Sequence, residues 1–508
     1  MKNKYLLILA CLFASCSVDQ SEQEEMVHFD YLISDVSIID GSGRPAYNGH
    51  VGVRDGKIAY VGEERPEKFE ADSVFSINGA VVSPGFIDLH SHGNPERTPE
   101  FENFLAMGVT TICLGQDGSG FTFTSPGEWN EFAQGPTGVN VIAFAGHGTL
   151  RELAGIGRKP VPDAAEMDSM KNILRTQLEW AFGLSTGLEY SPGMYAERDE
   201  LLELAKVTGS LDRVIMSHMR NEDDDQVIAS IDELAAQGTY SRVHIAHLKS
   251  VYGKGSERGE EILQHIRSIR NSGVDLTADI YPYTASYTGI SIVFPEWAKT
   301  REQFEQVKDA RRAELEDYLR ERVNSRNGPS ATLFGTKPYA GKTLADLQEE
   351  WDMPFEDILI DSIGPQGASA AYFVMNEELQ ETLISDSLIA ICSDGSPTGY
   401  HPRGHGTHAR IIEEFVKNRN VLELPEAIRK MTSYPAQILK LTDRGLIKEG
   451  YAADLLVFRP DQVKANATFE DPFQLASGFI LVMVNGEVAR RNAGSGVKLN
   501  GKFLTPSE

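Results

Sequence analysis

The fold of this chain is decided by residues 86–92, which read Phe-Ile-Asp-Leu-His-Ser-His. A strand-like apolar run ends here in two histidines, His90 and His92, and residues two apart in a strand point to the same face. Two imidazoles on one face can bind one metal ion. An H-x-H pair is by itself a weak indication of a metal site, so the rest of the chain has to support it.

Strand-like apolar runs recur along the chain, and each ends in a polar cluster. They cover residues 80–92, 109–116, 139–147, 182–190, 213–219, 242–249, 274–283 and 387–395. Stretches with apolar residues at three- and four-residue spacing lie between them, for example 164–181, 197–207, 223–237 and 257–271, and this spacing indicates amphipathic helices. Strands that alternate with helices in this way predict an α/β protein built on a (β/α)₈ TIM-like barrel.

The predicted strand ends carry many potential metal ligands. In a (β/α)₈ barrel the active site is made by residues at the carboxyl ends of the strands. Besides His90 and His92, these ends hold Asp117, Glu189, His218, His247 and Asp394. Nitrogen and oxygen donors of this kind suit Zn²⁺ or a similar ion, so the set predicts a metal centre.

Two other regions flank or interrupt the predicted barrel over residues 85–441. Residues 28–84 and 442–508 alternate apolar and polar residues around glycine-rich turns, and we expect them to pair into one small β-sandwich domain. An insertion over about 286–386 is too long for a plain loop, so it is a candidate lid over the catalytic face.

The amino terminus has the features of an export signal. Residues 1–16 begin with a charged segment and continue with a short apolar run that ends at Ser15-Cys16. Phe13-Ala14-Ser15-Cys16 resembles a bacterial lipobox, and Cys11 is a weaker alternative site of acylation. Residues 17–27 are polar and acidic, which is typical of a flexible tether or of a frayed terminus. We therefore expect an exported protein anchored to the bacterial cell envelope by a lipid on Cys16.

Charge and composition exclude several other functions. A net charge of −26 over 508 residues repels nucleic acid and anionic headgroups, and it means that an anionic substrate needs a local basic clamp. The glycine-rich run 115–120 lacks the lysine and the helix start of a phosphate loop. Cys113 and Cys392 lie inside apolar runs, so they read as core thiols.

The order of these residues resembles the amidohydrolase superfamily, with H-x-H on strand one, an acid on strand four, histidines on strands five and six and aspartate on strand eight. The likeness is closest to the N-acyl-D-amino-acid deacylases, or D-aminoacylases, and covers roughly residues 28–490. It is carried by GHGTLR (146–151), GLSTGLEYSPG (183–193), SHMRNE (217–222), AHLK (246–249), DIYPYTA (279–285) and HPRGHGTHAR (401–410).

This resemblance implies metal-dependent hydrolysis of a C–N amide bond, with N-acyl-D-amino acids as substrates and a carboxylate and a free D-amino acid as products. It assigns Asp394 as the proton shuttle between the attacking water and the leaving nitrogen. The substrate carboxylate would be held by residues at the family's clamp positions, with His147 near the acyl oxygen. The clamp residues are Lys249, Tyr283 (or Tyr281) and Arg403.

The sequence departs from the D-aminoacylase pattern at one metal position. Asp117 stands where those enzymes carry a cysteine ligand, and Glu189 stands where binuclear relatives keep a bridging carboxylate. We therefore expect one or two Zn²⁺ ions and favour Glu189 over Asp117 as the bridge.

Other interpretations of the same residues stay open at this point. Asp394 could be a helix N-cap, Arg403 a partner in an ion pair and Tyr283 a core aromatic residue. The whole chain could act on cyclic amides or dipeptides, as dihydroorotase-, hydantoinase- and isoaspartyl-dipeptidase-like enzymes do. It could also be a non-catalytic surface lipoprotein.

Overall fold

The computed structural model describes residues 26–491 and 496–506. The predicted signal and lipobox over residues 1–16, and residues 17–25 of the predicted tether, lie outside the described part of the chain.

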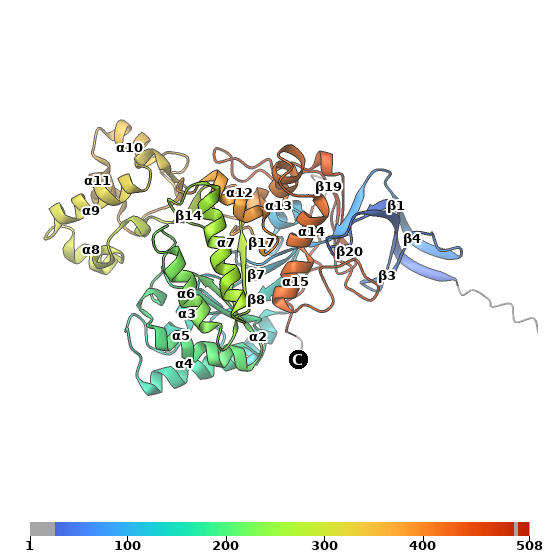
Figure 1. Ribbon diagram of the computed structural model, residues 1–508, viewed down its shortest axis with the longest axis horizontal. Helices are drawn as coiled ribbons and strands as arrows, with labels where there is room; N and C mark the ends of the chain where they lie inside the picture. The colour runs from blue at the N-terminus through green and yellow to red at the C-terminus, as the bar shows by residue number, and fades with distance from the viewer. Residues whose placement is uncertain (1–25, 492–495, 507–508) are drawn as a thin grey trace, which may run out of the picture.

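The central unit is a closed barrel of parallel strands (Figure 1). Its third strand is interrupted and has two parts, β8 and β9, and a parallel bridge between Ser91 and Gly395 joins the first strand to the last. The strands are β6 (Phe86–Asp88), β7 (Val109–Leu114), β8 (Asn140–Ala143), β9 (Ala145–Gly146), β10 (Gly183–Gly187), β11 (Val214–His218), β12 (Arg242–Ile245), β13 (Leu276–Ile280) and β17 (Ile389–Ile391). The predicted (β/α)₈ barrel is confirmed, with all eight strands in the predicted order.

Amphipathic helices cover the outside of this barrel. In α7 (Gly255–Asn271), Ile262, Leu263 and Ile266 are buried while charged residues fill the other face. The other barrel helices are α1 (Glu102–Ala106), α2 (Pro126–Phe132), α3 (His147–Leu153), α4 (Ala164–Gln177), α5 (Arg198–Ser210), α6 (Val227–Gln237), α12 (Glu377–Ser385), α13 (Arg403–Arg410), α14 (Leu424–Met431) and α15 (Ser433–Leu439).

Both ends of the chain build a second, β-rich unit beside the barrel. Its strands form one eight-stranded sheet, in which β5 pairs with β1 in parallel and with β18 in antiparallel register and so connects the two ends. They are β1 (Val27–Ile38), β2 (Tyr47–Arg54), β3 (Lys57–Gly62), β4 (Phe69–Ser76), β5 (Val81–Pro84), β18 (Leu455–Phe458), β19 (Phe479–Val484) and β20 (Glu487–Arg491). The predicted small β-domain built from both chain ends is therefore confirmed.

The last described residues return to the barrel, and this corrects the assignment of all of 442–508 to the β-domain. The backbone N–H of Leu504 donates to the carbonyl of Val141 on β8 at 2.8 Å. Phe503 packs its ring against Trp129 of α2, with ring centroids 5.6 Å apart. Phe503 and Leu504 are partly buried because they pack against hydrophobic clusters of the barrel.

The insertion between β13 and α12 forms a lobe with a hydrophobic core of its own. Phe294, Leu315, Phe334 and Tyr372 are among its buried residues. Its elements are β14 (Ser286–Gly289), α8 (Arg301–Val307), α9 (Arg312–Ser325), β15 (Thr332–Phe334), α10 (Leu344–Trp351), α11 (Phe355–Asp357) and β16 (Ser369–Tyr372). Figure 1 shows these helices at the end of the molecule opposite β1–β4, with the barrel between them.

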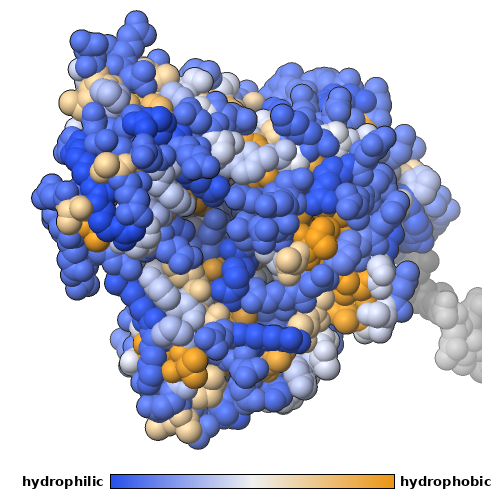
Figure 2. Space-filling model, turned by 60° about the vertical axis from the view of Figure 1, so that its left-hand side comes forward, coloured by the Kyte–Doolittle hydropathy of each residue, from blue (hydrophilic) through white to orange (hydrophobic). Residues whose placement is uncertain are grey.

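The surface of the molecule is mostly hydrophilic on the face that Figure 2 shows. On the face in Figure 2, hydrophilic residues cover most of the surface and hydrophobic residues form small separate patches. Among the helices of the described residues, none combines the length and the apolar character that crossing a bilayer requires.

Candidate active site

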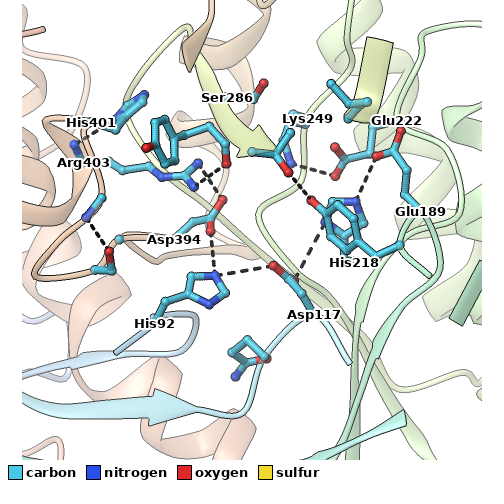
Figure 3. Close-up of a pocket in the computed structure, with 18 of the residues that line it drawn as sticks. His92, Asp117, Glu189, His218, Glu222, Lys249, Ser286, Asp394, His401 and Arg403 are labelled. Carbon is cyan, nitrogen blue, oxygen red and sulfur yellow. Dashed lines mark hydrogen bonds and ion pairs between the residues drawn. The ribbon is translucent and has the colours of Figure 1, made fainter. Parts of the chain in front are cut away.

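The predicted ligands meet at one mouth of the barrel, where Figure 3 shows His92, Asp117, Glu189, His218 and Asp394. A cavity of about 340 Å³ opens there. Barrel strand ends supply one side of its wall, and Ser286, Tyr287, Thr288, Ile292 and Arg326 of the insertion supply another. The insertion therefore contributes directly to the pocket.

Asp117 lies at the centre of the histidine cluster. Its Oδ1 is 3.2 Å from Nε2 of His90, 3.3 Å from Nε2 of His247 and 3.8 Å from Nδ1 of His218. Its Oδ2 is 3.4 Å from Nε2 of His92. The residue follows β7 with a left-handed backbone (φ 54°), which turns its side chain toward the barrel axis. One carboxylate thus faces all four histidines.

Glu189 occupies a more peripheral position than we expected. Its Oε2 lies 3.1 Å from Nε2 of His218, and no other predicted ligand is within ion-pair distance of it in the described chain. The preference for Glu189 as the shared carboxylate is therefore wrong on geometry, and Asp117 takes that place. The physical reason is the tight left-handed turn after β7, which brings Asp117 inward, whereas Glu189 follows β10 on the rim.

Glu222 is a site residue that the sequence reasoning missed. Its Oε1 is 3.3 Å from Nδ1 of His247 and accepts a hydrogen bond from Nζ of Lys249 at 2.7 Å. His218, Glu222 and His247 form a compact group of donors beside the one around Asp117. The signal was present, because Glu222 closes the SHMRNE motif.

The arrangement fits a metal ion. Donor atoms of His90, Asp117, His247 and Asp394 all lie within 4.8 Å of one another. Both ring nitrogens of the fully buried His90 lack a hydrogen-bond partner. Buried polar atoms without partners are costly, and coordination of an ion by Nε2, the nitrogen that faces Asp117, would satisfy that atom.

The carboxylates strongly perturb the titration of these histidines. Burial lowers the pKa of His92, but its hydrogen bonds to Asp117 and Asp394 outweigh burial and raise the pKa to about 9. Burial and the charge of Lys249 also oppose protonation of His247, yet Asp394, Asp117 and Glu222 raise its pKa to about 10. The site therefore attracts positive charge, as a cation-binding site must.

Asp394 joins the cluster to a buried arginine. Its Oδ1 is 3.2 Å from Nε2 of His92, and its Oδ2 is 2.7 Å from a guanidinium nitrogen of Arg403. Burial raises the pKa of this carboxyl, but the charges of Arg403 and His247 outweigh burial and hold the pKa well below its usual range. Asp394 follows β17 and caps no helix, so it is ionised and faces the cluster.

The predicted carboxylate clamp is only partly present in the pocket. Lys249 and Arg403 line it, and Nζ of Lys249 lies 2.8 Å from Nδ1 of His247. Tyr283 does not line it, because its hydroxyl turns away to the carbonyl of Pro402 at 3.4 Å, as a core aromatic residue would. The alternative, Tyr281, lies beneath both cations, with its ring centre 4.9 Å from Arg403 and 5.8 Å from Lys249.

His147 lies outside the pocket, which corrects its assignment to substrate binding. It is fully buried, and its Nε2 is 2.7 Å from Oε1 of Glu200 on α5, which also pairs with Arg151. The reason is that α3 begins at His147, so the side chain follows the helix surface instead of the strand direction. His147 belongs to a buried network between α3 and α5.

Comparisons with known proteins agree with this geometry. A model of the amidohydrolase family matches residues 337–490. The N-acyl-D-glutamate deacylase of Alcaligenes xylosoxydans xylosoxydans is 31% identical over 90% of this chain and 93% of its own length. The chain belongs to the amidohydrolase family. The D-aminoacylase of the same organism is 27% identical over 91% of this chain and 95% of its own length.

Solved structures point the same way. The N-acyl-D-glutamate deacylase of Bordetella bronchiseptica, in complex with zinc and a phosphonate mimic of the tetrahedral intermediate, superposes with a TM-score of 0.80 at 28% identity, covering 94% of this chain and all of that one. This amidohydrolase is therefore an enzyme that hydrolyses amide C–N bonds, and the predicted reaction class is confirmed. The related structure holds zinc, the ion predicted here, and the donor groups of this chain fit a metal ion. The interpretation as a non-catalytic lipoprotein is wrong.

Proposed function

We propose that this enzyme deacylates N-acyl-D-amino acids to a carboxylate and a free D-amino acid. The observation that carries the proposal is the juxtaposition, in one pocket, of the histidine and carboxylate cluster around Asp117 and the two buried cations Lys249 and Arg403. A hydrolase that acts on an N-acyl amino acid needs both an activated water and a cation for the substrate carboxylate. The similarity to N-acyl-D-glutamate deacylases and D-aminoacylases supports the D configuration.

The proposed ligands divide into two groups. Around the shared Asp117, His90, His92 and Asp394 would hold one zinc ion, and His218 and His247, with Glu222 or Glu189, would hold a second where two are bound. Zinc in such a site supplies an activated water and polarises the scissile carbonyl.

Asp394 has the position and charge of a proton carrier. Arg403 holds Oδ2, so Oδ1 is the oxygen that faces the cluster. Because the group is ionised, it can take a proton from the attacking water and return it to the departing nitrogen, which would otherwise have to leave as an amine anion.

The test is amine release from matched N-acetyl-D- and N-acetyl-L-amino acids by the zinc-loaded protein, with chelator-treated protein as control. We expect chelator-sensitive release from the D series alone. Release from neither series, with zinc still bound, would contradict the proposal and turn attention to cyclic amides and dipeptides.

We also propose that the protein is exported and anchored to the cell envelope through a lipid on Cys16. The charged and apolar start of the chain and the lipobox-like Phe13-Ala14-Ser15-Cys16 support this. Labelling growing cells with a palmitate analogue should tag the wild-type chain and not the Cys16→Ser variant, while Cys11→Ser should stay labelled. Equal labelling of the wild type and Cys16→Ser would contradict the anchor.

A further inference from the structure

The pocket contains a third buried cation whose charge is not balanced by the protein. Lys249 pairs with Glu222 at 2.7 Å and Arg403 pairs with Asp394 at 2.7 Å. Arg326 lines the same pocket and is 2% exposed, but within the described ranges no carboxylate comes within ion-pair distance of it. A buried charge without a partner is expensive, so it points to a charged ligand.

Two aromatic rings pack against the guanidinium of Arg326. Its central carbon lies 5.1 Å from the ring centre of Tyr372 and 6.0 Å from that of Tyr252. Among the described residues, its guanidinium makes one side-chain hydrogen bond, a long one of 3.4 Å to the hydroxyl of Tyr252, and Nε has no partner. The side chain is therefore positioned by packing, while most of its donors stay free to bind a planar anion.

An acid that lines the same pocket is already paired with another arginine. Asp223 also lines the pocket, but its carboxylate accepts a hydrogen bond from Arg322 at 3.0 Å. Arg322 belongs to α9, and Arg326 follows directly after the end of that helix. The two arginines therefore differ in their contacts. Arg322 forms an ion pair between the insertion and the barrel, whereas Arg326 lines the cavity.

The position of Arg326 separates it from the α-carboxylate clamp. The α-carboxyl carbon of an N-acyl amino acid is two bonds from the scissile nitrogen, so it must bind close to the metal ligands. Lys249 and Arg403 touch the ligands His247 and Asp394 directly, whereas Arg326 touches none of them and comes from the insertion lobe. Arg326 is therefore placed for a second anionic group, farther from the reacting bond.

We infer that Arg326 binds a carboxylate on the substrate side chain, and that the preferred substrates are N-acyl-D-amino acids with acidic side chains. This inference rests on the proposed function, because it concerns the substrate of that same pocket. It assigns side-chain selection to the insertion and amide hydrolysis to the barrel.

The test compares N-acetyl-D-glutamate and N-acetyl-D-aspartate with the neutral N-acetyl-D-glutamine and N-acetyl-D-methionine on the zinc-loaded enzyme. We expect kcat/KM to be roughly 10- to 100-fold higher for an acidic substrate than for N-acetyl-D-glutamine, as expected for a hydrogen bond between charged groups. Arg326→Met should abolish this ratio while N-acetyl-D-methionine turnover changes little, and Arg326→Lys should restore part of it. Arg311→Met, at the other end of α9 in an exposed ion pair with Glu314, is the matched control and should keep the ratio.

Two results would overturn the inference. One is equal kcat/KM for acidic and neutral substrates in the wild type. The other is an equal loss for both in Arg326→Met, which would assign Arg326 to the α-carboxylate. A binding measurement separates the inference from the proposed function. D-glutamate should raise the thermal unfolding temperature of the wild type more than D-glutamine does, and Arg326→Met should remove the difference, whether or not the acetylated substrates turn over.

Discussion

Asp394→Asn tests the proposed chemistry directly, because the substitution keeps the shape of the side chain while it removes the ability to carry a proton and the charge that faces Arg403. Asp394 has a left-handed backbone with φ 47°, a conformation that asparagine tolerates as well as aspartate. The amide oxygen can still accept the hydrogen bond that Arg403 now donates at 2.7 Å. The remaining donors His90, His92 and Asp117 can keep a zinc ion. A lost proton carrier lowers kcat by about 100- to 10,000-fold, or roughly 2.7 to 5.4 kcal/mol of barrier.

The assay is steady-state amine release with zinc in excess, so that weaker metal affinity does not imitate lost chemistry, together with the zinc content of the dialysed variant. The control is Asp352→Asn, since Asp352 has nearly the same backbone conformation, φ 48°, at the exposed end of α10 in the insertion. The control should keep its activity. A kcat for Asp394→Asn within about tenfold of the wild type would refute the assignment of the proton carrier.

The other predictions concern metal binding and pH. Asp117→Ala should weaken zinc affinity by at least about 100-fold, the most that is lost when a residue touches only a metal ligand and not the metal. Glu189→Gln should retain zinc on dialysis. The reverse order of zinc affinities would restore Glu189 as the shared ligand. Burial lowers the pKa of His408 to about 3, so its neutral form stabilises the fold above pH 6.5 and this stability is lost as the pH falls toward 3. Between pH 7 and pH 5, the free energy of unfolding measured with denaturant should therefore fall by about 2 kcal/mol less in His408→Phe than in the wild type. An equal fall in both proteins would contradict burial of neutral His408 as the cause.

The barrel and most of the site could be predicted from the sequence because their signals are local. Apolar runs that end in polar residues mark the carboxyl ends of parallel strands, and in a barrel these ends must converge. Strand periodicity predicts His90 and His92 on one face, and both reach Asp117 although β6 ends at Asp88. The convergence of His218 and His247 then follows from neighbouring strands, β11 and β12, which pair in parallel.

What the sequence could not provide was the direction of individual side chains after a strand ends. Asp117 moves to the centre through a left-handed turn, whereas His147 follows α3 outward to Glu200 because the helix starts at that residue. The ring of Tyr281 lies under the two cations whereas the hydroxyl of Tyr283 meets the carbonyl of Pro402, and only tertiary packing decides between the two tyrosines. Such choices depend on contacts far apart in the sequence.

The electrostatics of the pocket explain how a chain with a net charge of −26 can bind an anion. Exposed acids more than about 8 Å from the site are largely screened by salt. Buried charges interact with the ligand more strongly, because they are close to it and the dielectric constant around them is lower. Lys249 and Arg403 keep their positions because Glu222 and Asp394 pair with them, so each can gain a substrate contact without first being ordered. Arg326 has no such partner, and its charge remains available. The cation available for an acidic side chain therefore comes from the insertion, and binding of that side chain should be much less sensitive to salt than a surface interaction would be.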